Sequence, residues 1–144
     1  MKSAAAVLLL LVAASAQARD CTPQVRDGWI RLAPDGVAMP MLAGFGRIEN
    51  RCPKPIVVES ASSEVFGDVS LHRTSVVDGI SRMRALPALP IAADAAATLQ
   101  PGGLHLMLMQ PTTTLKPGTT VRIVFRLQDG RDVRGDFVAR RAAD

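Results

Sequence analysis

Residues 101–110, with the sequence PGGLHLMLMQ, carry the clearest strand signal of the chain. Pro-Gly-Gly indicates a turn. Leucine then alternates with His105, Met107 and Met109, and a period of two is typical of a β-strand whose two faces differ. We therefore predict a strand with one leucine face committed to the core. Its other face presents one imidazole and two thioethers.

Strand signals continue on both sides of this stretch, separated by residues that favour turns. The predicted strands cover residues 24–32, 41–49, 55–61, 68–74, 79–86 and 104–110, followed by a hairpin over 120–141 that turns at Asp129-Gly130. Residues 92–99, AADAAATL, could form a helical turn confined by Pro90 and Pro101. Short strands about 8–12 residues apart predict an all-β fold, a Greek-key β-sandwich or barrel.

The N-terminus has the features of a secretory signal peptide. Lys2 supplies a positive charge, residues 4–14 are apolar, and Ala16-Gln17-Ala18 fits a cleavage site. The apolar part is too short to span a membrane. We expect residues 1–18 to be the signal peptide and residues 19–144 to be a single exported domain. That domain would be periplasmic, without stable membrane insertion.

The two cysteines, Cys21 and Cys52, indicate a disulfide because the chain is expected to be exported. A loop of about 32 residues closed in this way would add about 3–4 kcal/mol to the free energy of unfolding. A thiolate metal site is less favoured, since neither cysteine has a histidine or second cysteine at ligand spacing. A lipid anchor at Cys21 is also less favoured, because Arg19 and Asp20 stand where small residues should precede a lipidated cysteine.

The charge pattern argues against nucleic acid as a partner. The chain has 17 basic and 13 acidic residues, for a net charge of +4, and the arginines are scattered among the acids. Nucleic-acid binding usually needs a concentrated basic patch with aromatic platforms, whereas this chain has one Trp, four Phe and no Tyr. We interpret the charges as a solvated surface.

The only two histidines, His72 and His105, both fall in predicted strands that carry or adjoin methionines. His105 and Met107 share a strand face about 7 Å apart, and Met83 lies on the strand after His72. Thioether sulfur is soft and uncharged, a poor ligand for Zn²⁺, Ca²⁺ or Mg²⁺ but a good one for Cu(I). A methionine stripe is, however, more often core packing, and a buried histidine is more often a hydrogen-bonded core residue. The residues alone leave both interpretations open.

The spacing of these four residues resembles that of a known family. His72, Met83, His105 and Met107 match the H-x10-M-x21-H-x-M signature of the PCu(A)C periplasmic copper chaperones. The surrounding stretches are similar too: GWIRLAP, GRIEN, SLHR, DGISRMR, LQPGGLHLMLM and LKPGTTVRIVF. The resemblance spans residues 27–137.

This resemblance implies a cupredoxin-like β-barrel or sandwich that binds one Cu(I) per chain through His72, Met83, His105 and Met107. The implied function is that of a monomeric metallochaperone, delivering copper to the assembly of copper sites in respiratory oxidase, above all cytochrome c oxidase. Many relatives carry additional methionines where this chain has Val76 and Ser81, and some carry a Met/His-rich tail that this chain lacks. A single site is therefore expected.

Three methionines of the expected mature domain lie outside the signature. Met109 is expected in the core or around the site, and Met39 and Met41 could help to cover the site.

An electron-transfer copper protein would need a cysteine thiolate beside the histidines. A metal-free exported binding domain would use the methionine face as core. An enzyme is the least supported reading, since no histidine would remain as a base and no HExxH or phosphate loop occurs.

Overall fold

The computed structural model describes residues 21–35 and 37–142 of the chain, so the expected signal peptide lies outside the described residues. Within those ranges the chain forms strands and no helix, and hence no helix that could cross a membrane. The strands are β1 (Gln24–Leu32), β2 (Met41–Asn50), β3 (Ile56–Ser62), β4 (Phe66–Val77), β5 (Ile80–Ala85), β6 (Leu89–Ile91), β7 (Ala95–Leu99), β8 (Leu104–Pro111), β9 (Thr120–Leu127) and β10 (Asp132–Arg141).

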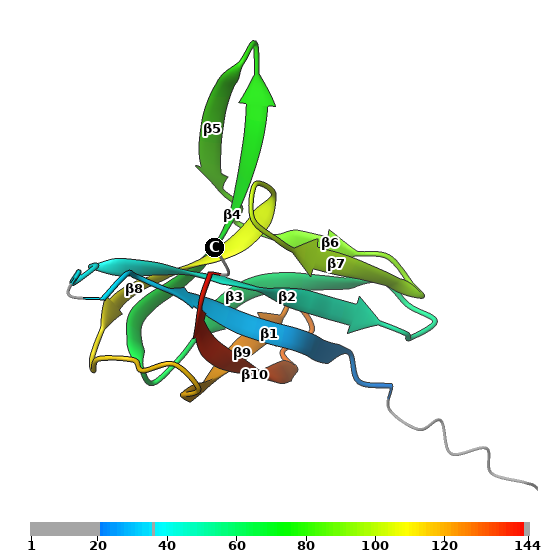
Figure 1. Ribbon diagram of the computed structural model, residues 1–144. Helices are drawn as coiled ribbons and strands as arrows, with labels where there is room; N and C mark the ends of the chain where they lie inside the picture. The colour runs from blue at the N-terminus through cyan, green and yellow to red at the C-terminus, as the bar shows by residue number, and fades with distance from the viewer. Residues whose placement is uncertain (1–20, 36, 143–144) are drawn as a thin grey trace, which may run out of the picture.

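The strands close into a barrel, and strands distant in sequence lie side by side (Figure 1). The sheet order is β5-β4-β8-β7-β2-β1-β10-β9-β3-β6, and further pairings of β4 with β3 and of β8 with β2 close it. The first and last strands, β1 and β10, run parallel, whereas β9 and β10 form the expected antiparallel hairpin. The prediction of an all-β Greek-key fold is confirmed.

The barrel interior is filled by aliphatic and phenyl side chains from alternate strand positions. Leu106 and Leu108 of β8 are fully buried there, together with Phe125 and Phe137. Burying one such side chain contributes about 1.5–3 kcal/mol to stability. Gly44 of β2 lies against β8, and a Cβ at position 44 would come within 3.2 Å of the Leu106 side chain. The predicted leucine face of β8 is confirmed as a core face.

The structure corrects the sequence prediction between residues 87 and 99. The predicted helical turn at 92–99 is wrong: β7 is a strand that pairs antiparallel with the second half of β2. Its Ala97 and Leu99 are buried while alternate residues face outward. Alanine favours helix, but pairing with β2 overrides that local preference. The short strand β6 was not predicted, because Pro90 stands in its middle; it pairs only with β3.

The N-terminal start of the barrel is fixed by a covalent and a polar link. Cys21 and Cys52 form the expected disulfide, with their Cα atoms 5.5 Å apart. Beside it, the fully buried Asn50 side chain donates to the carbonyls of Lys54 and Ala92 and accepts from the Cys52 backbone N–H. These contacts join the end of β2 to the segment that follows β6.

Strands β4 and β5 form a hairpin that projects from the barrel (Figure 1). The first half of β4 pairs with β8 in the barrel, and its second half pairs with β5 alone. Every residue of β5 is exposed. A two-stranded hairpin without a packed face has little stability of its own, so the position of β5 depends on contacts at the base of the hairpin.

Candidate metal centre

The four predicted ligands come from three adjacent strands on the outside of the barrel. His72 of β4 lies directly opposite His105 of β8, and Ser70 lies opposite Met107. Met83 of β5 lies opposite Thr74 of β4, two residues beyond His72. Residues that face each other across a strand pair share a sheet face, so all four ligand positions belong to one outer surface.

His105 is buried and oriented by the backbone of the preceding turn. The carbonyl oxygen of Gly103 lies 3.0 Å from His105 Nδ1 and also accepts the Thr74 backbone N–H at 3.0 Å. Since a carbonyl can only accept, the Nδ1–H of His105 donates to it. This bond fixes the tautomer of the neutral ring and leaves the lone pair on Nε2. His105 is only 7% exposed.

The Nε2 atom of His105 lies 3.1 Å from the sulfur of Met83. With the proton on Nδ1, Nε2 is an acceptor, and a thioether sulfur is also only an acceptor. In this neutral tautomer, the lone pair of Nε2 and a lone pair of the Met83 sulfur face each other. Two atoms bonded to one ion at about 2.0–2.3 Å lie roughly 3–4 Å apart, so this contact has the geometry of two ligands of one soft cation.

His72 stacks against His105, with ring centroids 6.0 Å apart. Its Nε2 is 3.1 Å from the Ser70 hydroxyl, while its Nδ1 is inaccessible to solvent and has no hydrogen-bond partner among the described residues. Burial lowers the pKa of His72, and the neighbouring His105 lowers it further, against an opposing effect of Asp68. A low pKa keeps the imidazole neutral, which is the form that binds a metal.

Met107 completes the set through the strand register. It lies two residues from His105 on the same face of β8, between Ser70 of β4 and Ala43 of β2. It is only 8% exposed, yet it does not belong to the core cluster inside the barrel. The methionine is thus buried within the outer layer and not used to fill the barrel. The second face of β8 has the composition that the sequence predicted.

One wall of this outer layer was not predicted from the sequence. Phe45 follows Gly44, the last β2 residue paired with β8, and Gly44 lies opposite Leu106, the neighbour of His105 in the chain. The ring of Phe45 lies 4.7 Å from the ring of Trp29, and the Arg31 guanidinium lies 5.0 Å from the Phe45 ring. In the sequence FGRIEN, strand alternation puts Phe45 and Ile48 on opposite faces. This alternation could have indicated that Phe45 lies on the outer face.

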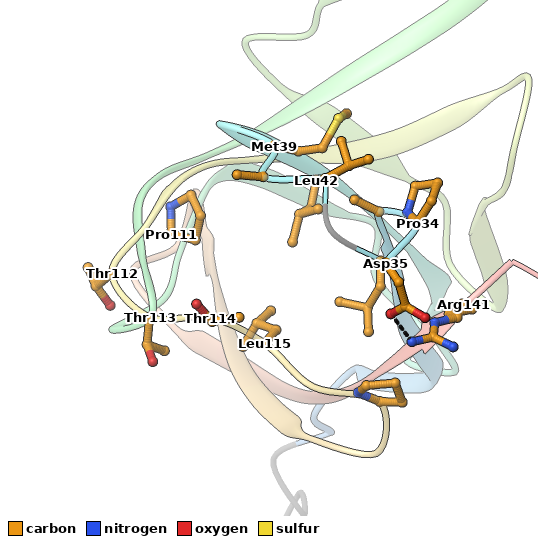
Figure 2. Close-up of a pocket in the computed structure, with 15 residues that line it drawn as sticks. Pro34, Asp35, Met39, Leu42, Pro111, Thr112, Thr113, Thr114, Leu115 and Arg141 are labelled. Atoms are coloured by element: carbon orange, nitrogen blue, oxygen red, sulfur yellow. Dashed lines mark hydrogen bonds and ion pairs between the residues drawn. The ribbon is translucent and has the colours of Figure 1, made fainter.

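A pocket of about 590 Å³ lies elsewhere, at the end of the barrel where β1 ends and β2 begins (Figure 2). It is lined by Pro34, Leu42, Leu115 and neighbouring loop residues, and an Asp35–Arg141 ion pair lies at its edge. None of the four predicted ligands lines it. Within the described residues, no three His, Cys, Asp or Glu side chains cluster as a metal site either, so a metal centre here depends on methionine sulfur.

Comparison with known proteins gives both a family and a fold. Residues 24–139 match the family model described as putative lipoprotein LpqE-like. A putative lipoprotein of Leifsonia xyli is 32% identical over 108 residues, which are 74% of this chain and 63% of that protein. The chain thus spans less than two thirds of the length of this relative.

Solved structures that resemble the chain include PCuAC domains and the protein DR1885. The Cu(I) form of DR1885 from Deinococcus radiodurans is 27% identical with a TM-score of 0.65, covering 91% of this chain and 85% of that protein. Its apo form is 26% identical with a TM-score of 0.64, covering 99% and 96%. The copper-bound PCuAC domain of PmoF2 is 16% identical with a TM-score of 0.66, covering 83% and 93%. These likenesses confirm the cupredoxin-like fold and the resemblance drawn from the His/Met signature.

Proposed function

The chain belongs to the family of LpqE-like putative lipoproteins and has the fold of PCuAC domains, and from this premise we propose that it is an exported copper-binding protein of the chaperone type. It binds one Cu(I) through His72, Met83, His105 and Met107. The observation that carries this proposal is the contact between His105 Nε2 and Met83 Sδ, where two acceptor atoms face each other at 3.1 Å.

The chemistry of the donor set favours Cu(I) over other ions. Two imidazoles and two thioethers are neutral, and the thioethers select a soft cation. The Gly103 carbonyl orients one imidazole in advance. The ligand shell combines the buried His105 and Met107 with Met83, which is 52% exposed. A ligand on an exposed hairpin gives the ion a route in and out, which suits a carrier better than a permanent redox site.

An electron-transfer role has less support. Such copper sites use a cysteine thiolate with two histidines. The chain has two cysteines, and both are joined in the Cys21–Cys52 disulfide. No thiolate is therefore supplied by this chain in its oxidised form. An enzyme is disfavoured for a related reason, since both histidines are used as copper ligands.

The family and the disulfide support a proposed location. LpqE-like relatives are described as lipoproteins, but Cys21 of this chain is bonded to Cys52 and cannot also carry a thioether-linked lipid. We therefore propose a periplasmic protein without a lipid on Cys21, and we keep the expectation of a monomer. Its proposed recipient is the copper-site assembly of respiratory oxidase. Transfer of Cu(I) to the isolated copper-binding domain of cytochrome c oxidase tests this step, and retention of all copper by the donor would refute it.

A competitive titration tests the binding function. The chain from Arg19 onward is titrated against a chromophoric Cu(I) chelator, without oxygen and with ascorbate, which leaves the disulfide intact. We expect one tightly held equivalent. His105→Asn retains a donor toward the Gly103 carbonyl but loses Nε2, and Met107→Leu retains volume but loses sulfur; both should weaken Cu(I) binding by about tenfold or more.

The matched control for this titration is Met39→Leu, which removes a thioether that lines the separate pocket and is not one of the four proposed ligands. It should leave the first equivalent unchanged. Equal Cu(I) affinities for the original chain, His105→Asn and Met107→Leu would refute the assigned site. A chain with no Cu(I) affinity would leave the metal-free binding domain as the better account.

A further inference from the structure

The described methionines lie on the outside of the barrel, although methionine is usually a buried residue. Met39 is 46% exposed, Met41 is 37% exposed and Met83 is 52% exposed. Neither these three nor Met107 and Met109 belong to the core cluster or to the partly buried residues packed against it. Of the two expected positions for Met109, in the core or around the site, its place outside the core cluster favours the second. Within the described residues, thioethers are thus kept out of the core cluster.

Two of these methionines face each other beside the site. Met41 of β2 lies directly opposite Met109 of β8. The Cβ atoms of such a pair are about 4.5–5.5 Å apart on the same face, which is within the reach of two flexible thioether side chains. Met109 in turn lies about 7 Å along the strand from the proposed ligand Met107. The methionine positions thus continue along this face from the buried Met107 to the exposed Met41.

A negative charge stands on the other side of this pair. Asp68 of β4 lies opposite Met109 in the β4–β8 register and is exposed. It is close enough to His72 to act on the pKa of that residue. A carboxylate at this place attracts a cation toward the sulfur pair, whereas thioethers alone carry no charge.

We propose that Met41 and Met109 form a second, weaker Cu(I) site at the open edge of the proposed four-ligand site. This inference rests on the proposed function, because the ion bound there would pass to Met107 and the histidines. The pair offers two neutral sulfur ligands in place of two imidazoles and two thioethers, so it binds Cu(I) less tightly. It is selective for soft monovalent ions and does not hold Zn²⁺, for which thioether is a poor ligand.

Methionine methyl NMR measures both sites in one experiment. The chain from Arg19 onward carries ¹³C-methyl methionine and is titrated with Ag(I), a redox-inert substitute for Cu(I), and then with Cu(I). We expect the first equivalent to shift the methyl signals of Met83 and Met107. The second equivalent should shift those of Met41 and Met109 together, while Met39 stays in place.

Single leucine substitutions isolate the pair, since Met→Leu conserves volume and rarely disturbs packing. In Met41→Leu the second-equivalent shift of Met109 should be lost, and in Met109→Leu that of Met41 should be lost. Met39→Leu is the control and should preserve both shifts. The same titration with Zn²⁺ should shift neither methyl group.

Two results would overturn the inference. One is a second equivalent that shifts neither Met41 nor Met109. The other is a Met109 shift that persists in Met41→Leu. The first equivalent tests the proposed function separately. If it left the methyl signals of Met83 and Met107 unchanged, the four-ligand site would be refuted, whatever the signals of Met41 and Met109 did.

Discussion

At the scale of single residues, the Gly103 carbonyl orients the imidazole of His105 in the metal-free protein. The signature predicts that His105 is a ligand, but only the structure places its Nδ1 against the Gly103 carbonyl. The same is true of the contact between Nε2 and the Met83 sulfur. Both depend on how β5 and the turn before β8 meet, which is a property of the fold and not of the local sequence.

The pKa of His72 gives a prediction for the metal-free protein. Burial and the nearby His105 lower this pKa below the ordinary value of 6.5. An NMR pH titration of the apo chain should therefore show a His72 midpoint below 6.5. As the pH falls below 6.5, the unfolded chain binds a proton before the folded chain does. His72 therefore lowers stability progressively from about pH 6.5 down to its folded pKa.

The control for this effect is His72→Gln, which removes the titrating ring. Urea unfolding at pH 7.5 and 5.5 should show a larger loss of stability for the original chain than for the variant. An equal loss in both chains, or a His72 midpoint above 6.5, would contradict the assigned environment of the imidazole.

At the scale of elements, the alternation of a strand was predictable wherever its two faces met different environments. β4 and β8 show this clearly: Val69, Leu71 and Leu106 are buried in the core, while His72 and His105 lie on the outer face. β7 was not predictable, because its alanine-rich sequence lacks a contrast between faces and only pairing with β2 makes it a strand.

A β-bulge in β1 was also beyond the sequence prediction. The pairing of β1 with β2 shifts between Arg26 and Trp29, and Asp27 has a positive φ of 54°. At Gly28 a Cβ would lie 2.6 Å from the Asp136 carbonyl oxygen. A glycine is therefore required where β1 approaches β10. The bulge precedes Trp29, the residue that packs against Phe45 beside the site.

Removal of the disulfide should lower the stability of the chain but leave its Cu(I) affinity unchanged. The loop between Cys21 and Cys52 spans 31 positions, so Cys21→Ser with Cys52→Ser should lower the free energy of unfolding by about 2–4 kcal/mol. Cys52 is seven residues along the chain from Phe45, or roughly 20 Å in an extended strand. Cu(I) affinity should therefore be unchanged. Urea unfolding and the chelator titration measure the two quantities, and a loss of copper affinity in a folded variant would contradict this separation.

The β4–β5 hairpin gives a prediction about motion. Every residue of β5 is exposed, and Met83 of β5 contacts His105 of the barrel strand β8. Cu(I) bound to both residues would hold the hairpin to the barrel. Amide hydrogen exchange in β5 should therefore slow on adding one equivalent of Cu(I), while exchange in β9 stays constant. Met83→Leu is the control, and in this variant Cu(I) should no longer slow the exchange. An exchange rate in β5 of the original chain that Cu(I) leaves unchanged would contradict ligation by Met83.

At the scale of the whole molecule, the barrel and the projecting hairpin divide the site between a rigid and an exposed part. Closure of the sheet by the β4–β3 pairing fixes β4 and β8, which carry His72, His105 and Met107. The hairpin carries Met83 outside that closed structure (Figure 1). A site built in this way can keep three ligands in place while the fourth gives access.

The sequence predicted most of the strands but not how they meet, and the four ligand positions stay a prediction. Periodicity identifies a strand from local contrast, and the His/Met spacing identifies a family pattern. Which strands become neighbours depends on contacts between residues far apart in the chain, such as the pairing of β1 with β10. The Trp29–Phe45 wall and the Met41–Met109 pair both arise from that long-range register.

X-ray absorption at the copper edge measures the proposed ligand set of the copper ion. The chain from Arg19 onward is loaded with one equivalent of Cu(I), and the scattering shell around copper is resolved into nitrogen and sulfur. The account predicts a mixed shell of two imidazole nitrogens and two thioether sulfurs, which loses one sulfur in Met107→Leu. A shell without sulfur, or one unchanged by Met107→Leu, would contradict a copper site built from the imidazole and thioether face of β8.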